Sequence, residues 1–171
     1  AIPKVSLQDR QAIPRYIAVE GPIGAGKTTL AKHLASSLDY PSLFEPVIDN
    51  PFLEGFYNDR SSDLALPTQL YFLLHRTRKV AEIPKNDLLE PTLITDFIAE
   101  KDRIFAEATL DANELALYNQ ISEALYKKGP SPDLVIYLQA SVPTLKKRIQ
   151  SRGIMFEQSI ETHYLENLVE R

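Results

Sequence analysis

Hydrophobic positions along the chain fall into short continuous runs that alternate with runs of helical spacing. Residues 16–19 form a short apolar run, which is typical of a buried parallel strand. The segment 27–38 that follows places Leu30, Leu34 and Leu38 four residues apart, the spacing of an amphipathic helix. A strand followed directly by a helix predicts the first β-α unit of the fold.

The same alternation continues to the end of the chain. Weaker strand patterns occur in "SLFEP", which stops at Pro46, and in "TLITDF" at 92–97, whereas "DLVIYLQA" at 133–140 is the clearest buried strand. Asn50 and Pro51 mark a helix start as N-cap and first helical residue. Further helices are predicted over 63–81 (closed by Pro84), 100–108, 113–127, 142–152 (ended by Gly153) and the C-terminal segment. Four strands alternating with helices predict one α/β domain over residues 1–171, with a parallel sheet.

Composition narrows the class of protein. The 171 residues are 44% hydrophobic and 25% charged, and they carry a net charge of −4. This balance gives no basic footprint, so we expect no nucleic-acid partner. The chain has no Cys, and no apolar run approaches the ~20 residues of a membrane span. We therefore expect a cytoplasmic protein without a membrane partner, in which residues 1–14 form a short arm before the first strand.

The segment between the first strand and the first helix carries the strongest motif. Its residues fit G-x-x-x-x-G-K-[ST], and a strand before it and a helix after it are the context that this motif requires. Backbone N–H groups of such a loop and the positive end of the helix hold phosphates. The lysine reaches the β- and γ-phosphates, and the hydroxyl at the last position ligates Mg²⁺. The predicted ATP-binding residues are Gly21, Pro22, Ile23, Gly24, Ala25, Gly26, Lys27, Thr28 and Thr29.

Two carboxylates follow the next strands. Glu45 ends "LFEP" and Asp96 ends "LITD", and the carboxyl ends of parallel strands share the edge at which the phosphate loop lies. Glu45 is therefore a candidate base that accepts a proton from a substrate hydroxyl, or else a solvated residue at a strand end. Asp96 is a candidate Mg²⁺ ligand, or else the N-cap of the helix that follows.

Together, "GPIGAGKTT", "FEPVIDNPFLEGFY", "LPTQLYFLLHRTR", "TDFIAEKDRIFA" and "PDLVIYLQASVPTLKKRIQSRG…FEQ" resemble the deoxynucleoside kinases. The match is closest to the bacterial deoxyadenosine/deoxyguanosine kinase branch and runs in order from about residue 16 to the end. The resemblance implies a P-loop three-layer sandwich with a parallel sheet and a short lid at about 150–158. It also implies transfer of the γ-phosphate of ATP, with Mg²⁺, to the 5′-hydroxyl of a deoxynucleoside, and a homodimer.

The resemblance implies roles for individual residues. Glu45 matches the general base, Gln69 the glutamine that binds the base of the nucleoside, and Tyr57 with Glu157 the pair that holds the 3′-hydroxyl. Arg76 and Asp102 match the charged pair beside the base, which favours a purine deoxynucleoside over thymidine and leaves deoxycytidine open.

Arg148 and Arg152 match basic residues at the start of the lid that closes over ATP. Each assignment has a plainer alternative. Gln69 would be exposed, Tyr57 a core aromatic, the two arginines solvated near a helix C-terminus, and Asp102 paired with Lys101 or Arg103 on the surface.

The sequence departs from the family pattern in three places. An E-R-S triplet is common after the third strand, but here the aligned residues are Asp96, Phe97 and Ile98, without the arginine. Ile154 stands where a further lid arginine is expected. The family also closes its sheet with a fifth strand, whereas only four strand patterns occur here, so we expect the sequence to be part of a longer chain or to lack internal loops.

Two other functions stay open at this point. A nucleoside monophosphate kinase shares the phosphate loop but needs extra arginines for its acceptor. A non-catalytic accessory protein of the same fold, such as the accessory subunit of respiratory complex I, is the second. Intact Lys27, Thr28 and Glu45 favour an enzyme.

Overall fold

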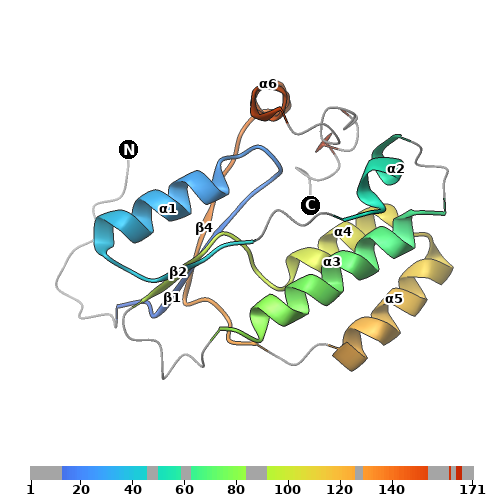
Figure 1. Cartoon of the computed structure of the whole chain (residues 1–171), viewed down its shortest axis with the longest axis horizontal. Helices are drawn as coiled ribbons and strands as arrows, with labels where there is room; N and C mark the ends of the chain where they lie inside the picture. Colours follow the sequence, from blue (N-terminus) through green and yellow to red (C-terminus); the bar gives the residue numbers. More distant parts are fainter. Residues whose placement is uncertain are drawn as a thin grey trace.

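Four parallel strands form one sheet at the centre of the fold (Figure 1). The computed structural model describes residues 13–45, 50–58, 63–83, 92–125, 129–153, 162 and 165–166. Within these residues the spatial order of the strands is β2-β3-β1-β4, so β1 is central and contacts β3 on one side and β4 on the other. The strands are β1 (Tyr16–Glu20), β2 (Ser42–Leu43), β3 (Leu93–Thr95) and β4 (Leu134–Tyr137).

Helices cover both faces of this sheet, which gives three layers (Figure 1). Helix α1 contacts β1, β2 and β3 on one side, and α3 packs with α4 and α5 on the other. The helices are α1 (Lys27–Leu38), α2 (Leu53–Asn58), α3 (Ala65–Val80), α4 (Lys101–Thr109), α5 (Ala112–Leu125) and α6 (Val142–Arg152). The predicted three-layer α/β fold with a parallel sheet is confirmed.

The two faces of β1 bury different sets of side chains. Successive residues of a strand point to opposite faces. Ile17 and Val19 pack with Ala31 and Ala35 of α1, and the small alanines let the helix approach the sheet closely. On the other face, Tyr16 and Ala18 belong to a cluster with Val80, Leu93 and Phe97. Burial on both sides explains why β1 is an uninterrupted apolar run before Glu20.

Several predicted element boundaries are confirmed. The Asn50 side chain accepts a hydrogen bond from the backbone N–H of Phe52 at 3.0 Å, close to the predicted helix start, but α2 begins at Leu53 and Pro51 is therefore not its first residue. Helix α3 ends at Val80, one residue before the predicted end at residue 81 and ahead of Pro84. Helix α6 ends at Arg152, and Gly153 caps it with φ 70°, a left-handed conformation that glycine adopts at little steric cost.

Two sequence predictions need correction. The last strand was expected to be the most buried, but Leu134, Val135 and Tyr137 are 44%, 45% and 52% exposed. The reason is its place: among the described residues, β4 lies at the edge of the sheet and pairs only with β1. The second strand is shorter than "SLFEP", because only Ser42 and Leu43 pair with β3. The helix predicted over 113–127 corresponds to α5, and the predicted residues 126 and 127 lie outside the described residues.

Some predictions fall outside the described residues. They include the N-terminal arm up to residue 12, the lid beyond residue 153 and most of the C-terminal helix, of which residues 162, 165 and 166 are described as helical. Among the residues that the structure does describe, no helix is both long enough and apolar enough to cross a lipid bilayer.

Candidate active site

The phosphate loop connects β1 to α1, and three glycines give it its curvature. Gly21, Gly24 and Gly26 have φ angles of 147°, 82° and 98°, which side-chain-bearing residues rarely adopt. Gly21 is also tightly packed, because a Cβ atom there would lie 2.5 Å from the backbone oxygen of Leu138 after β4. The sequence pattern therefore produces the curled backbone that the motif predicts.

Lys27 lies at the first position of α1 and folds back over this loop. Its Nζ donates hydrogen bonds to the backbone oxygens of Gly21 and Pro22, at 2.8 and 3.0 Å. Burial, and after it the positive charge of Lys101, lowers the pKa of Lys27 to about 8, although nearby carboxylates oppose the shift. An anion bound in the loop would stabilise the protonated form of Lys27 and raise its pKa again.

Thr28 and Asp96 meet at the edge of the sheet. The Thr28 Oγ1 donates to Asp96 Oδ2 at 2.5 Å, and the backbone N–H of Glu45 donates to Asp96 Oδ1 at 2.6 Å. Asp96 is only 2% exposed, and among the described residues it forms no ion pair. Its predicted alternative as a helix N-cap is wrong, since α4 begins at Lys101 and Glu100 occupies the cap position.

This pair fits the Mg²⁺ that accompanies ATP in P-loop enzymes. Mg²⁺ is usually held by one or two carboxylates together with phosphate oxygens and water, and a buried carboxylate that forms no salt bridge among the described residues suits that role. The described residues contain no group of three or more His, Cys, Asp or Glu side chains that would hold a metal on their own. Thr28 and Asp96 therefore fit a metal that arrives with the nucleotide.

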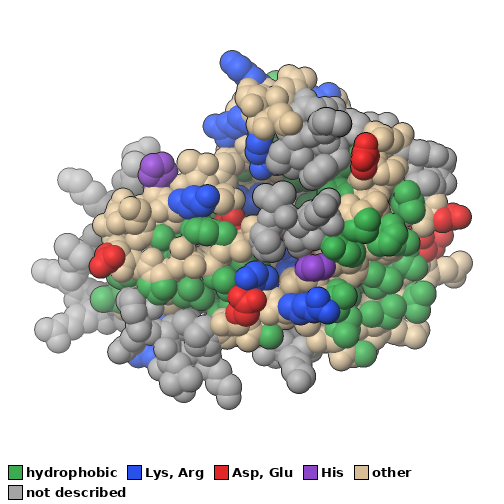
Figure 2. Space-filling model, in the orientation of Figure 1, with side chains coloured by type: hydrophobic (Ala, Val, Ile, Leu, Met, Phe, Trp, Pro, Cys, Tyr) green, Lys and Arg blue, Asp and Glu red, His purple; other side chains and the backbone are tan. Residues whose placement is uncertain are grey.

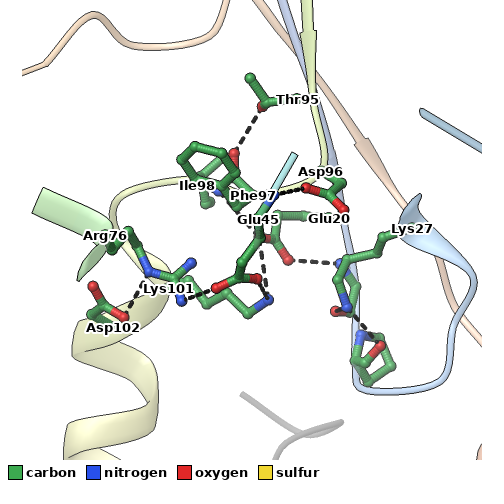
Figure 3. A network of polar contacts seen from close by, with 12 residues as sticks. Glu20, Lys27, Glu45, Arg76, Thr95, Asp96, Phe97, Ile98, Lys101 and Asp102 are labelled. Carbon is green, nitrogen blue, oxygen red and sulfur yellow. Dashed lines mark hydrogen bonds and ion pairs between the residues drawn. The ribbon is translucent and has the colours of Figure 1, made fainter. Parts of the chain in front are cut away.

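Glu45 follows β2 and lies between two cations (Figure 3). Its Oε1 is 2.5 Å from Arg76 Nη2, and its Oε2 is 3.5 Å from Lys101 Nζ. Burial alone would raise the pKa of Glu45, but the charges of Lys101, Arg76 and Lys27 outweigh it and lower the pKa below its usual value. Glu45 is therefore ionised at neutral pH and able to accept a proton. Its alternative as a solvated strand end is wrong.

Arg76 links Glu45 to Asp102. The Arg76 Nε is 2.7 Å from Asp102 Oδ1, and both side chains are buried, at 7% and 8% exposure. Asp102 therefore does not pair with Lys101 or Arg103 on the surface; Arg103 instead pairs with Glu107. Among the described residues, the Nη1 of Arg76 is buried without a hydrogen-bond partner.

Gln69 lies on the same side of the site. It is 3% exposed, so its alternative as an exposed helix residue is wrong. Buried polar groups are normally paired. The unpaired Nη1 of Arg76 and the amide of Gln69, which line the same cavity, thus suit a polar ligand.

A single cavity of about 790 Å³ joins these groups. The phosphate loop forms one part of its wall, and α2, α3 and α4 form the other. Glu45 lies between these two parts. The predicted site residues that line it are Ile23, Gly24, Ala25, Gly26, Lys27, Thr28, Thr29, Glu45, Tyr57, Gln69, Arg76, Asp96, Asp102, Arg148 and Arg152. Residues far apart in the sequence therefore meet in one site.

The lid arginines are brought to the cavity from α6. Arg148 Nη1 donates to the backbone oxygen of Ala25 at 3.0 Å, so this residue contacts the phosphate loop. Arg152 lies one turn later and also borders the cavity. Figure 2 shows Lys and Arg side chains over α6 at the top of the view. Glu157 lies outside the described residues, so its predicted role is not tested.

Two charged residues of the site were missed at the level of sequence. Glu20, at the end of β1, is 7% exposed, and Lys101, the first residue of α4, lies 3.8 Å from it and 3.5 Å from Glu45. Lys101 had been considered only as a surface partner of Asp102. A signal for Glu20 was present, since a carboxylate directly before a phosphate loop ends a fully apolar strand.

The fold and the site together define a P-loop phosphotransferase. The sequence profile described as "Deoxynucleoside kinase" matches residues 17–171. The chain belongs to the deoxynucleoside kinase family, and it is an enzyme of that class.

Curated relatives carry related names. The chain is 42% identical over 155 residues to a deoxyguanosine kinase of Bacillus subtilis, covering 90% of this chain and 74% of that protein. It is 31% identical over 166 residues to a deoxyadenosine kinase of Dictyostelium discoideum, covering 95% and 67%.

Solved structures agree on the fold. The structure of a deoxyadenosine kinase from M. mycoides with bound dATP matches with a TM-score of 0.76 at 29% identity, covering 91% of this chain and 80% of that one. The same enzyme with bound dCTP matches with a TM-score of 0.76 at 28% identity, covering 91% and 79%.

Proposed function

We propose that this chain transfers the γ-phosphoryl group of ATP to the 5′-hydroxyl of a purine deoxynucleoside. One observation carries the proposal above all. A carboxylate held ionised by two cations, Glu45, shares a cavity with a phosphate loop whose lysine is Lys27. A base on one side of the cavity and a phosphate cradle on the other suit phosphoryl transfer to an alcohol.

The chemical step is in-line displacement at the γ-phosphorus. Glu45 accepts the proton of the 5′-hydroxyl, the O5′–P bond forms, and the bond to the β,γ-bridging oxygen breaks, so that ADP leaves. Lys27, at the first turn of α1, stabilises the charge that develops on the phosphates. Mg²⁺ bound with ATP would be held by Thr28 and Asp96 and would neutralise phosphate charge.

Recognition of the nucleoside falls to the α3 and α4 side of the cavity. Gln69 offers an adjacent amide donor and acceptor for the edge of a base, and Arg76 with Asp102 presents a fixed charged pair beside it. Tyr57, which lines the same wall, and Glu157 are proposed to hold the 3′-hydroxyl. The names of the relatives, deoxyguanosine kinase and deoxyadenosine kinase, support a purine substrate.

Arg148 and Arg152 are proposed to contact the phosphates of ATP from the α6 side. The Arg148 contact to the backbone of Ala25 supports this role, because it places a guanidinium directly against the phosphate loop. The cations on α6 also offset the lack of an arginine at Phe97, which is 1% exposed and packs in the core.

A panel of the four deoxynucleosides with ATP and Mg²⁺ tests the function and the specificity together. We expect turnover of deoxyguanosine and deoxyadenosine, with thymidine poor. Each purine deoxynucleoside is compared with its 5′-monophosphate in the same assay. Turnover of the monophosphate alone would indicate a nucleoside monophosphate kinase, and absence of any transfer would favour the accessory role.

The assembly and its location are also proposals. Leu74 on α3 and Leu117 and Leu125 on α5 are 37%, 46% and 38% exposed, and Figure 2 shows hydrophobic side chains gathered over these helices. We infer that this face pairs two copies into a homodimer, which light scattering after size-exclusion chromatography would measure. A cytoplasmic location and the lack of a nucleic-acid partner stay predictions from the composition.

A further inference from the structure

We propose that Lys101 is a positioning residue for the base Glu45, and that Glu20 anchors Lys101 in that position. This inference rests on the proposed function, in which Glu45 accepts the proton of the substrate hydroxyl. Figure 3 shows Lys101 directed at both carboxylates, between the end of β1 and the residue that follows β2. The three side chains come from β1, the β2 end and α4, so only the fold brings them together.

The place of Lys101 on its helix is unfavourable for the helix itself. It is the first residue of α4, where the macrodipole disfavours a cation and favours an acidic residue. Its side chain is also largely buried, at 13% exposure. Lys101 thus opposes the helix dipole at a largely buried position and does not stabilise its own helix. Such locally unfavourable residues are typical of functional sites. The benefit lies in the two carboxylates that Lys101 faces.

Glu20 is held rigidly in the role of anchor. Its Oε2 accepts a hydrogen bond from the backbone N–H of Gly21 at 2.9 Å, and its Oε1 accepts one from the backbone N–H of Ile98 at 3.2 Å. Lys101 Nζ lies 3.8 Å from the same Oε1. A carboxylate this buried is costly without a cation, so Glu20 fixes Lys101 and Lys101 compensates Glu20.

Lys101 then holds the oxygen of Glu45 that Arg76 does not reach. Arg76 contacts Oε1 and is committed to Asp102 as well, whereas Lys101 contacts Oε2. Two cations on two oxygens fix the orientation of the carboxylate, which a base needs in order to point at its proton.

Lys101 also lies toward the phosphate loop. It lines the same cavity as Lys27, and its charge contributes to lowering the pKa of Lys27. Phe97, the position at which the family resemblance predicts an arginine, is buried and uncharged. Lys101 therefore supplies positive charge beside Glu45 where the side chain of Phe97 supplies none.

Three variants separate this role from a general effect of charge or stability. Lys101→Met removes the ammonium group and keeps much of the stem, Lys101→Arg keeps the charge, and Arg103→Met removes an exposed cation from the same helix. Each is assayed at saturating deoxyguanosine and ATP, and each melting temperature is recorded.

We expect Lys101→Met to lower kcat by about 10²-fold, as when one preorganised charge is removed from a site of phosphoryl transfer. The KM values change far less, Lys101→Arg recovers most of the activity, and Arg103→Met matches the parent.

The outcomes decide the inference. A parent enzyme that phosphorylates deoxyguanosine together with a Lys101→Met variant of unchanged kcat overturns the role of Lys101 and leaves the proposed function intact. A parent that phosphorylates no deoxynucleoside overturns the proposed function instead. If Lys101→Met does not fold, Lys101→Arg and Glu20→Gln supply the test. Glu20→Gln must then lower kcat at little cost in KM, and unchanged kcat in this variant overturns the anchoring.

Discussion

The guanidinium of Arg76 lies 2.5 Å from the carboxylate of Glu45, and this contact joins the recognition side of the site to its chemical side. Arg76 belongs to the middle of α3, while Glu45 follows a two-residue strand. A change in how Arg76 meets the base of the nucleoside would therefore also be felt by the residue that takes the proton. In the proposed function, substrate recognition and catalysis therefore share one partly buried ion pair.

Removing the negative charge of Glu45 should abolish most of the chemistry while keeping nucleotide binding. Glu45→Gln keeps the shape of the side chain but cannot accept the proton, so kcat should fall by about 10²–10⁴-fold. Binding of ATP, measured by calorimetry, should change little because the phosphate loop is intact. A Glu45→Gln variant with parental kcat would show that another group takes the proton.

Removing Arg76 should destabilise the fold. Arg76→Met leaves two buried carboxylates, Glu45 and Asp102, without their shared cation, and breaking a buried pair in this way costs about 3–5 kcal/mol of unfolding free energy. Urea denaturation followed by circular dichroism measures the loss. The added change Asp102→Asn should recover part of it, because it removes one uncompensated charge. Equal stability of the single and double variants would contradict this coupling.

Two glycines of the phosphate loop should differ in their tolerance of alanine. Gly21→Ala combines an unfavourable φ of 147° with a Cβ only 2.5 Å from the Leu138 backbone oxygen, whereas Gly26→Ala carries the unfavourable φ of 98° alone. The φ strain costs about 1–3 kcal/mol, so Gly21→Ala should be the more destabilised of the two. Thermal melts of both variants check the order. The reverse order would mean that the contact to β4 is relieved by a small movement.

The stability of the protein should fall at alkaline pH partly through Tyr118. This residue is 1% exposed, and burial together with the charge of Asp102 raises the pKa of its hydroxyl, which Arg76 opposes. A raised pKa means that the folded state binds the proton more tightly. The stabilisation is thus complete below the unfolded pKa of about 10 and is lost as the pH rises above it.

Tyr118→Phe removes this ionisation. The unfolding free energy of the variant should therefore decline less than that of the parent between about pH 9 and pH 11, the range in which an unfolded-state tyrosine with a pKa of about 10 loses its proton. Tyr137→Phe is the matched control, since Tyr137 is 52% exposed on β4. Urea titrations at a series of pH values provide the comparison. An identical alkaline decline in Tyr118→Phe and the parent would exclude Tyr118 as the source.

How far the sequence can predict depends on how local each feature is. Gly21 to Thr28 are contiguous, so their backbone angles and their position before α1 follow from neighbouring residues alone. The pattern for β1 is similarly decisive, because a strand buried on both faces must be apolar throughout. Asp96 and Glu45 were also predictable as neighbours, since the carboxyl ends of parallel strands share one edge.

Features that depend on partners distant in the chain were not predictable in this way. The exposure of β4 follows from its place at the edge of the described sheet, and its apolar sequence carries no information on that place. The partner of Asp102 is Arg76, 26 residues away. This pair was expected only from the family resemblance, because local spacing alone offered Lys101 and Arg103 as partners.

The sequence by itself determined the phosphate loop, the alternation of strands and helices, and the identity of the family. The tertiary structure alone decided that Glu20 and Lys101 belong to the site and that Glu45 is held between two cations. The physical reason is that backbone conformation is set by neighbouring residues, whereas the burial and charge of a side chain depend on which distant segments the fold places beside it.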